Sequence, residues 1–417
     1  MAEIRTFRAV RPATNMEKKI AALPYDVYNR KEATLVVKQN PDSFLAIDRA
    51  ETSFDDSVNT YDERVYRRAD ELLQEKIKRG DYIVEDQAMY YIYALTMNGR
   101  TQHGFVACAS IDDYDDQVIK KHENTRADKE QDRIRHVDAC SMQTGPVFLA
   151  YRQVPELKEI MKQETSRDAL YDFVSEDGIR HTVWQIADQS TQKKIHDAFE
   201  KMQAIYIADG HHRCASAVKV GKMRREKYPE YTGEEEFNFF LSVLFPEEEL
   251  YIMDYNRVLK DLNGHSASDI LSFLEKDFTV SLIGKEAYRP ETKGKFGFYI
   301  DGKWYQLTSK THCFSDDPVK NLDVSILQDR VLKPLFDISD PKTDKRIDFV
   351  GGIRGLKELE RRCSEDCVAA FSMFPTNIKE LFDVADAGLL MPPKSTWFEP
   401  KLRSGLFLHE IERSWDE

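Results

Sequence analysis

A short apolar run that stops at a polar turn is the most constraining feature of this sequence. Residues 205–208 read Ile-Tyr-Ile-Ala, residues 209–213 read Asp-Gly-His-His-Arg, and the chain resumes with small residues that suit a helix. This order predicts a buried strand, a tight turn and a helix. Ligand crevices of open α/β sheets lie at such junctions, so the pattern indicates a binding site at the turn.

The chemistry of this turn suits an anion, and phosphate above all. A helix that begins here directs unpaired N–H groups and the positive end of its dipole at one spot. Gly210 fits a turn that requires a positive φ or a close backbone approach. Arg213 offers a fork of donors that matches phosphate oxygens, while His211 and His212 can donate hydrogen bonds, move a proton or bind a metal. The alternative is that Asp209 only caps the helix and the histidines lie on the surface.

Composition excludes several classes of protein. The 417 residues suffice for two domains, and 41% hydrophobic with 32% charged residues is typical of a globular protein. The net charge of −13 disfavours nonspecific binding to nucleic acid or an anionic membrane. No apolar stretch approaches the roughly 20 residues of a membrane helix, and the N-terminus lacks a signal-peptide pattern. We therefore expect a cytoplasmic protein with small-molecule partners and no nucleic-acid or membrane partner.

Turn signals and β-rich runs recur along the chain and predict a mixed α+β fold. Three hairpin turns are expected between β-rich runs, at Asn98-Gly99, Asp177-Gly178 and Asp301-Gly302. Helices are expected over residues 61–79, 323–335, 354–363 and 376–386, and Asn29 is a candidate helix cap. Six cysteines without a CxxC pair indicate neither a disulfide framework nor a zinc knuckle.

A boundary between two domains is expected at residues 231–236, where Tyr-Thr-Gly precedes three glutamates. The N-terminal α/β region, residues 1–232, then carries the candidate active site. The C-terminal α+β region, residues 233–417, contributes hairpins, helices and a proline-rich loop. Its first hairpin is expected to pair the apolar runs 237–245 and 250–255.

A densely charged segment between residues 118 and 136 is a second candidate phosphate-binding surface. If the segment is helical, its basic residues fall at steps of three and four on one face, with acidic groups off that face. This basic stripe comprises His122, Arg126, Lys129, Arg133 and His136. A solvated helix face is the alternative, but the sorting of charges by sign favours contact with phosphate.

Six separated motifs across nearly the whole chain resemble the bacterial domain-of-unknown-function family one thousand and fifteen. The motifs are residues 24–27, 121–130, 143–146, 209–213, 255–257 and 391–396. The polar turn is also similar to that of the free-serine kinases with a ParB/sulfiredoxin-like fold, which phosphorylate the hydroxyl of L-serine. The resemblance implies a phosphate-binding core of that fold with a large insertion, followed by the C-terminal α+β region.

The resemblance also implies roles for residues. In the serine kinases the turn holds donor phosphates, and a glutamate of an upstream His-Glu pair activates the serine hydroxyl. That glutamate corresponds to Glu123, next to His122. A longer segment separates Glu123 from the turn here than in the compact kinases.

We therefore expect a kinase that converts free L-serine to O-phosphoserine with ADP, ATP or pyrophosphate as donor and Mg²⁺ as cofactor. The sequence has no Walker loop or kinase Gly-rich loop and does not choose among the donors. The expected catalytic residues are His122, Glu123, Asp209 and His212, with Asp209 as the Mg²⁺ ligand. The expected phosphate or donor contacts are Gly210, His211, His212, Arg213, Arg126, Lys129 and Arg133. The expected substrate contacts are Tyr25, Asp26, Asn256, Arg257, Lys394 and Thr396.

Two other classes of function stay open. A metal-dependent hydrolase would use Asp209, His211 and His212 as ligands, although adjacent histidines lack the i, i+4 spacing of helical zinc sites and no distant third ligand is evident. A nucleotide-binding switch or a DNA-partitioning relative would keep the phosphate turn without catalysis. The acidic composition and the lack of a basic helix-turn-helix segment argue against DNA.

Overall fold

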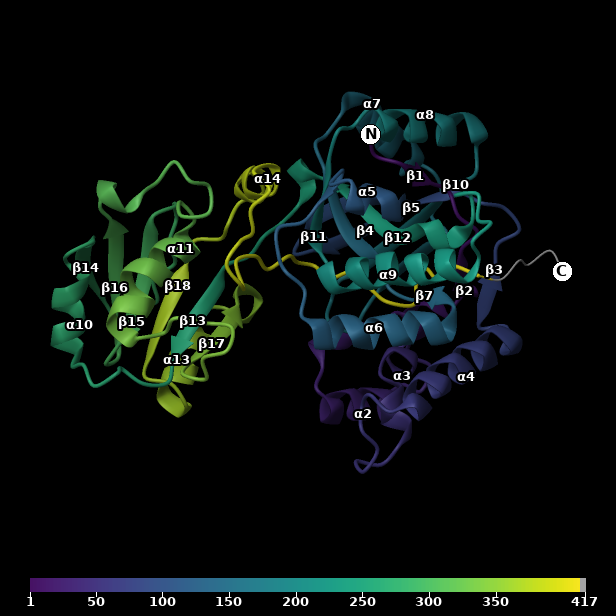
Figure 1. The fold of residues 1–417 in the computed structure, drawn as a ribbon. Helices are drawn as coiled ribbons and strands as arrows, with labels where there is room; N and C mark the ends of the chain where they lie inside the picture. The colour runs from purple at the N-terminus through teal and green to yellow at the C-terminus, as the bar shows by residue number, and fades with distance from the viewer. Residues whose placement is uncertain (413–417) are drawn as a thin grey trace. The chain divides into compact units, whose positions relative to one another are not determined.

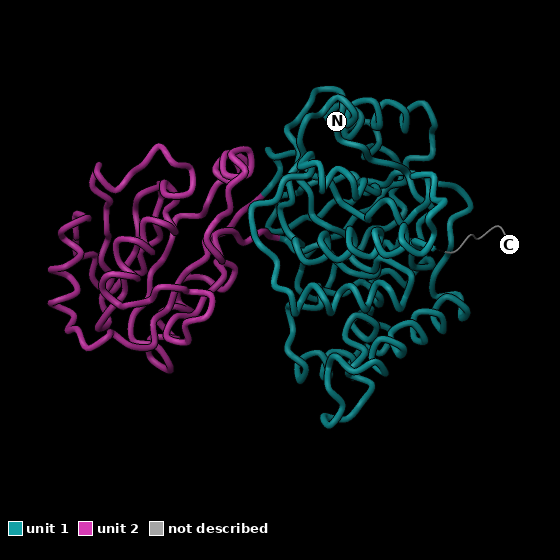
Figure 2. Tube along the Cα trace, viewed as in Figure 1, with its two compact units in different colours: residues 1–250, 400–417 teal, residues 251–399 magenta. Residues whose placement is uncertain are grey.

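The computed structural model describes residues 1–412, and the chain divides into two compact units (Figure 2). Unit 1 comprises residues Met1–Leu250 together with the C-terminal segment that begins at Pro400, and unit 2 comprises Tyr251–Glu399. Both units combine helices with a sheet, so the predicted mixed α+β class is confirmed.

A mixed sheet forms the centre of unit 1, with nine strands among the described residues (Figure 1). The strands are β1 (Ile4–Arg5), β4 (Tyr90–Met97), β5 (Arg100–Ser110), β6 (Ile119–Lys120), β8 (Val147–Tyr151), β9 (Tyr171–Val174), β10 (Arg180–Ile186), β11 (Ile205–Asp209) and β12 (Phe239–Pro246). Their order is β6-β11-β8-β12-β5-β4-β10-β9, and β1 pairs with β5. The pairs β6–β11 and β8–β12 are parallel, whereas β11 runs antiparallel to β8.

Helices and two small sheets surround this sheet. The helices of unit 1 are α1 (Glu17–Ile20), α2 (Arg30–Gln39), α3 (Leu45–Asp48), α4 (Glu63–Arg79), α5 (Ile111–Asp115), α6 (Ala127–Cys140), α7 (Pro155–Glu164), α8 (Gln189–Glu200) and α9 (His211–Lys227). The small sheets pair β2 (Val10–Pro12) with β3 (Tyr82–Val84) and β7 (Met142–Gln143) with β19 (His409–Glu410). Within the described part of the chain, no helix has the length and apolar character needed to cross a bilayer.

Two large apolar cores and a smaller apolar cluster stabilise unit 1 among the described residues. In the main core Leu157 of α7, Phe199 of α8 and Val218 of α9 pack with buried side chains of the sheet. The second core joins α2, α3 and α4 with β2, β3 and Leu408 of the C-terminal segment. Because burial of apolar area is the main favourable term in folding, both the helical layer and the returning C-terminal segment are firmly part of unit 1.

Local signals in the sequence explain several of these elements. Asn29 caps α2 in a capping box with Glu32, as predicted. The hairpins predicted at Asn98-Gly99 and Asp177-Gly178 join β4 to β5 and β9 to β10. The strand, turn and helix predicted around residues 205–220 are β11, Gly210 and α9.

Unit 2 contains a second sheet, of order β14-β16-β15-β18-β13-β17. Its strands are β13 (Tyr255–Leu259), β14 (Phe278–Gly284), β15 (Lys295–Ile300), β16 (Lys303–Ser309), β17 (Ile347–Gly351) and β18 (Ala369–Met373). Its helices are α10 (Ala267–Leu274), α11 (Asp323–Leu327), α12 (Lys333–Phe336), α13 (Lys357–Glu365) and α14 (Ile378–Asp386). The hairpin predicted at Asp301-Gly302 joins β15 to β16.

The hairpin predicted between residues 237–245 and 250–255 is wrong. Strand β12 pairs with β5 and β8 in unit 1, and β13 pairs with β17 and β18 in unit 2. The division into units therefore falls at residue 250 rather than after residue 232, because β12 completes the first sheet. The C-terminal segment from Pro400 also belongs to unit 1. The predicted C-terminal region, residues 233–417, is therefore wrong at both of its ends.

A buried histidine of unit 1 gives a testable pH dependence of stability. His181 is fully buried between Tyr93 and Ser175, with its Nδ1 at 2.8 Å from the Tyr93 hydroxyl and its Nε2 at 3.0 Å from the Ser175 hydroxyl. Burial, reinforced by the positive charge of Arg403, lowers the pKa of His181 to about 3. Between that value and the ordinary histidine pKa of about 6.5, only the unfolded chain binds the proton, so stability falls as pH falls.

Below pH 6.5 we expect His181 to lower the free energy of unfolding by about 1.4 kcal/mol for each unit by which the pH falls. Urea unfolding of unit 1, followed between pH 7 and pH 4, measures this slope. A His181→Gln variant keeps a polar side chain that does not titrate. The dependence of its free energy of unfolding on pH is expected to be shallower, by an amount that corresponds to the loss of up to one bound proton. An identical slope in both proteins would contradict the assignment.

Candidate functional site

The polar turn lies where β11 ends and α9 begins. Gly210 adopts φ 89° and ψ 31°, in the left-handed region that favours glycine. A Cβ atom at this position would lie 3.0 Å from Nη2 of Arg213, so a side chain here would also require the guanidinium to shift by a few tenths of an ångström. The first N–H groups of α9 have no partner within the helix and, with its dipole, give the turn a geometry that suits an anion.

Asp209 is ionised and lies among cations. One carboxylate oxygen accepts a hydrogen bond from the Gly210 N–H at 2.9 Å, and the other lies 3.3 Å from Nζ of Lys401. Burial raises the pKa of Asp209, but Lys401 and Arg213 outweigh this effect and hold the pKa at about 2. Arg213 itself donates from Nη1 to the Pro146 carbonyl at 2.8 Å, which fixes its guanidinium beside the turn.

Two buried histidines face each other beside the turn. The rings of His122 and His211 lie edge to face with centroids 4.5 Å apart. The backbone N–H of His122 donates a hydrogen bond to Nε2 of His211 at 3.4 Å. Burial lowers the pKa of His122 to about 4 and that of His211 well below its usual value, so both are neutral at pH 7. His212 has a different contact, since its Nε2 accepts from the Arg126 N–H at 2.9 Å.

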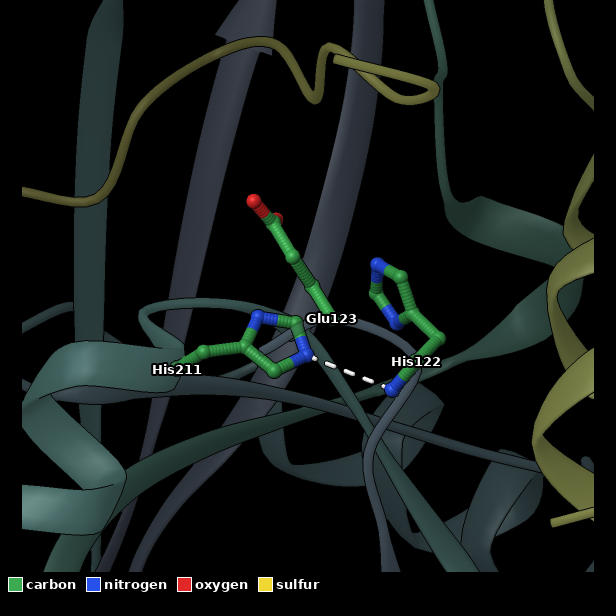
Figure 3. A group of neighbouring side chains, drawn as sticks. All are labelled: His122, Glu123 and His211. Atoms are coloured by element: carbon green, nitrogen blue, oxygen red, sulfur yellow. Dashed lines mark hydrogen bonds between the residues drawn. The ribbon is translucent and has the colours of Figure 1, made fainter. Parts of the chain in front are cut away.

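Glu123 lies beside the turn in spite of the long segment of chain between them (Figure 3). One oxygen of Glu123 and one ring nitrogen each of His122 and His211 all lie within 4.8 Å of one another. The cause is the parallel pairing of β6 with β11, in which Ile119 pairs with Ile205. Parallel strands end at the same edge of a sheet, so the residues that follow β6 meet the start of α9.

The predicted basic stripe is wrong for two of its five members. Helix α6 begins only at Ala127, so His122 lies in the preceding loop and Arg126 is the N-cap residue. Arg126 pairs with Asp128 at 2.8 Å. The other members, Lys129, Arg133 and His136, lie on α6 at steps of four and three and share a face, as predicted.

These α6 residues line a pocket of unit 1 with Tyr25 and Asp26, which the 3₁₀ turn η1 (Tyr25–Val27) carries. The pocket, which we name the Tyr25 pocket, has a volume of about 380 Å³. The Arg133 guanidinium lies 4.0 Å from the centroid of the Tyr25 ring, and burial raises the pKa of Tyr25 to about 12. The structure thus brings together Tyr25, Asp26, Lys129 and Arg133, all predicted site residues.

A smaller cavity, of about 30 Å³, is lined by residues of the Tyr25 pocket and by Arg213 of the turn. It is lined by Arg213 and Gly145 and also by Tyr25, Asp48, Arg133 and His136, which line the Tyr25 pocket as well. Such a volume holds about one water molecule. The Tyr25 pocket is therefore close to the turn that carries Arg213.

Four predicted substrate contacts, Asn256, Arg257, Lys394 and Thr396, belong to unit 2, and their contact with a substrate stays a prediction. Asn256 uses its amide within the sheet, because Nδ2 donates to Asp254 at 2.6 Å and Oδ1 accepts from the Met373 N–H at 2.9 Å. Arg257 is buried and donates to the Lys394 carbonyl at 3.0 Å. Thr396 lies in the same loop as Lys394, and both are members of unit 2. The hydrogen bonds of Asn256 with Asp254 and Met373 favour a structural role for this residue.

Lys401, which is not among the site residues expected from the sequence, lies against Asp209. It is the second cation of the proline-rich loop that also carries Lys394. Nothing in the local sequence indicates that the chain returns to unit 1 at residue 400. The pairing of Lys401 with Asp209 is therefore a product of tertiary structure.

The residues at the turn do not fit a Mg²⁺ ion held by the protein. Both oxygens of Asp209 are engaged by Gly210 and Lys401, and Arg213 adds a further positive charge. The cluster of His122, Glu123 and His211 offers two imidazoles and one carboxylate, a set that suits transition metals better than Mg²⁺. Asp209 as a Mg²⁺ ligand stays a prediction of the sequence.

The turn geometry predicts the effect of a single methyl group. Gly210→Ala is expected to displace the Arg213 guanidinium and to weaken pyrophosphate binding, measured by calorimetry. Gly178→Ala is the matched control, because Gly178 has a similar φ of 80° with nothing within 4 Å of the added Cβ. Both variants are expected to lose about 1–2 kcal/mol of stability, whereas only Gly210→Ala loses affinity. Equal pyrophosphate affinity in the two variants would contradict a part for the Arg213 guanidinium, in its present position, in pyrophosphate binding.

Comparison with known proteins places this chain in a family. No curated protein matches the sequence. A free serine kinase variant in complex with ADP shares 12% identity over 74% of this chain and 92% of its own, with a TM-score of 0.37. A conserved hypothetical protein from Pyrococcus furiosus shares 15% over 73% and 95%, with a TM-score of 0.34. SbnI with a C-terminal truncation, from Staphylococcus aureus, shares 11% over 75% and 90%, with a TM-score of 0.39.

At these TM-scores the structural likeness carries no argument about activity. The sequence pattern of the family described as protein of unknown function (DUF1015) matches residues 4–325, which is most of the chain. The resemblance seen in the sequence motifs is therefore confirmed, and the chain belongs to the DUF1015 family.

Proposed function

We propose that this protein is a small-molecule phosphotransferase that phosphorylates the hydroxyl of free L-serine. The observation that best supports the proposal is the position of the Glu123 carboxylate, beside His211 at the first residue of α9. Phosphoryl transfer needs a phosphate site and a carboxylate near the incoming hydroxyl, and the nearness of Glu123 to the start of α9 supports both roles. Nucleotide or pyrophosphate is the donor.

In this proposal, the turn at residues 209–213 binds the phosphate that is transferred. Backbone N–H groups at the start of α9 and the guanidinium of Arg213 offer donors to the transferring phosphate. Lys401 and Arg213 neutralise Asp209, so that the anionic donor does not meet an uncompensated carboxylate. These groups are fixed in advance by Gly210 and by the Arg213 contact with Pro146, which favours stabilisation of charge in the transition state.

The acceptor side falls to Glu123. Its carboxylate accepts the proton of the serine hydroxyl while the oxygen forms a bond to phosphorus and the bond to the leaving phosphate breaks. His122 and His211 are neutral and packed against each other, so they lie near Glu123 without placing a positive charge beside it. A neighbouring imidazolium would lower the basicity of the carboxylate.

Substitution of Glu123 tests this role. Glu123→Gln keeps the size of the side chain but cannot accept the proton, so we expect loss of O-phosphoserine formation with donor affinity largely unchanged. Arg213→Ala is expected to show the opposite pattern, with weakened donor binding. The assay incubates the full chain with L-serine and ADP, ATP or pyrophosphate in turn, each with and without Mg²⁺, and measures O-phosphoserine.

Glu159→Gln is the matched control, because Glu159 is an exposed glutamate of α7 outside the site. It is expected to retain full activity. Absence of O-phosphoserine with every donor, in a folded wild-type protein, would remove the kinase proposal.

The cluster of His122, Glu123 and His211 favours a second candidate function, a metal-dependent hydrolase. The predicted ligand set for that function was Asp209, His211 and His212, but Asp209 and His212 have other contacts and the neighbouring ligand atoms belong to His122 and Glu123. Two neutral imidazoles and a carboxylate form a common set for zinc or iron.

Metal analysis separates the two functions. If the protein is a hydrolase, the purified chain holds one equivalent of a transition metal, and His122→Ala and His211→Ala each abolish its binding. If it is a kinase, the protein is active as O-phosphoserine synthase after chelation of transition metals. Elemental analysis and the O-phosphoserine assay on the same sample decide between them.

A further inference from the structure

The Tyr25 pocket has charged walls whose charges are almost fully paired. Arg133 lies 2.9 Å from Asp132, and Arg49 lies 2.6 Å from Glu51. Arg30 donates to backbone carbonyls, among them those of residues 51, 55 and 58. These groups form the wall of the pocket and have little capacity left to recognise a charged ligand.

Asp26 and Lys129 are the exceptions. Both line the Tyr25 pocket, and neither has a hydrogen bond or an ion pair through its side chain among residues 1–412. Lys129 and Asp26 thus line the same space and carry opposite charges. A free charge of each sign in one pocket is complementary to a zwitterion.

A buried ring nitrogen provides an independent indication of a ligand. His136, only 3% exposed, lines the same pocket, and its Nδ1 has no hydrogen-bond partner within the described structure. Its Nε2 contacts the Ile47 carbonyl at 3.2 Å. An unpaired buried polar atom is costly, and a polar ligand or a water molecule in the pocket would satisfy it.

From this arrangement we propose that the Tyr25 pocket binds a free α-amino acid as its zwitterion, with Lys129 on the carboxylate and Asp26 on the ammonium group. The volume of about 380 Å³ lies in the range of small-molecule sites. The proposal rests on the proposed function in one respect, since it makes this amino acid the phosphoryl acceptor. Tyr25 and Arg133 line both this pocket and the small cavity at Arg213, so the pocket is adjacent to the phosphate turn.

Calorimetry with the full chain and no phosphate donor tests the binding by itself. The ligands are L-serine, L-serinamide, which lacks the carboxylate, and glycerate, which lacks the ammonium group. Serine is expected to bind, and each analogue to bind roughly tenfold more weakly or worse, because each loses one charged hydrogen bond.

Two variants assign the charges to residues. Lys129→Met is expected to weaken serine binding roughly tenfold and to leave serinamide binding unchanged, and Asp26→Asn to weaken serine binding similarly and to leave glycerate binding unchanged. Lys162→Met and Asp86→Asn are matched controls, because both residues are exposed and lie outside the pocket. Both controls are expected to bind serine as the wild type does.

Serine affinity that is unchanged in both Lys129→Met and Asp26→Asn overturns the proposal, and so does an absence of serine binding. Loss of AMP binding in these variants with serine binding intact also overturns it, and assigns the pocket to a nucleoside. The experiments distinguish a failure of the kinase proposal from a failure of the proposal that the Tyr25 pocket binds an amino acid. Serine binding with the expected pattern but no O-phosphoserine would remove only the kinase function, whereas O-phosphoserine formation with an unchanged KM for serine in both variants would remove only this pocket assignment.

Discussion

The parallel pairing of β6 with β11 is the constraint on which the site depends. Only two residues of β6 take part, yet the pair Ile119–Ile205 fixes where the chain leaves the sheet after both strands. Because parallel strands end at one edge, Glu123 and His211 are held together although they are distant in the sequence. A slip of this register by one residue would turn the side chains that follow β6 to the other face of the sheet.

Charge at the turn is balanced before any ligand binds. Asp209 is kept ionised by Lys401 and Arg213, and the neighbouring histidines are kept neutral by burial. Ionised Asp209 accepts the Gly210 N–H and thereby stabilises the left-handed turn that α9 requires. The remaining positive potential comes from the helix terminus and the guanidinium, which are rigid groups, so an anion would meet donors that need little rearrangement.

The sequence predicts those parts of the site that local chemistry determines. The strand, the glycine turn and the helix around residue 210 follow from residue types within a few positions, as do the hairpins at Asn98-Gly99 and Asp301-Gly302. The start of α6 was missed because the charge spacing continues upstream of Ala127, where β6 and a loop replace the helix. The position of β12 was missed because its partners, β5 and β8, are remote in the sequence.

Ion pairs between remote elements are likewise not predictable from the local sequence, and these pairs decide which charged residues are available to bind a ligand. Arg133 and Lys129 are equivalent in the sequence, one helical turn apart on α6. In the structure Arg133 is paired with Asp132 and stacked on Tyr25, whereas Lys129 has no such partner among the described residues. A basic pattern therefore identifies the surface but not the cation that is free to recognise a ligand, because that depends on carboxylates and rings supplied by other elements.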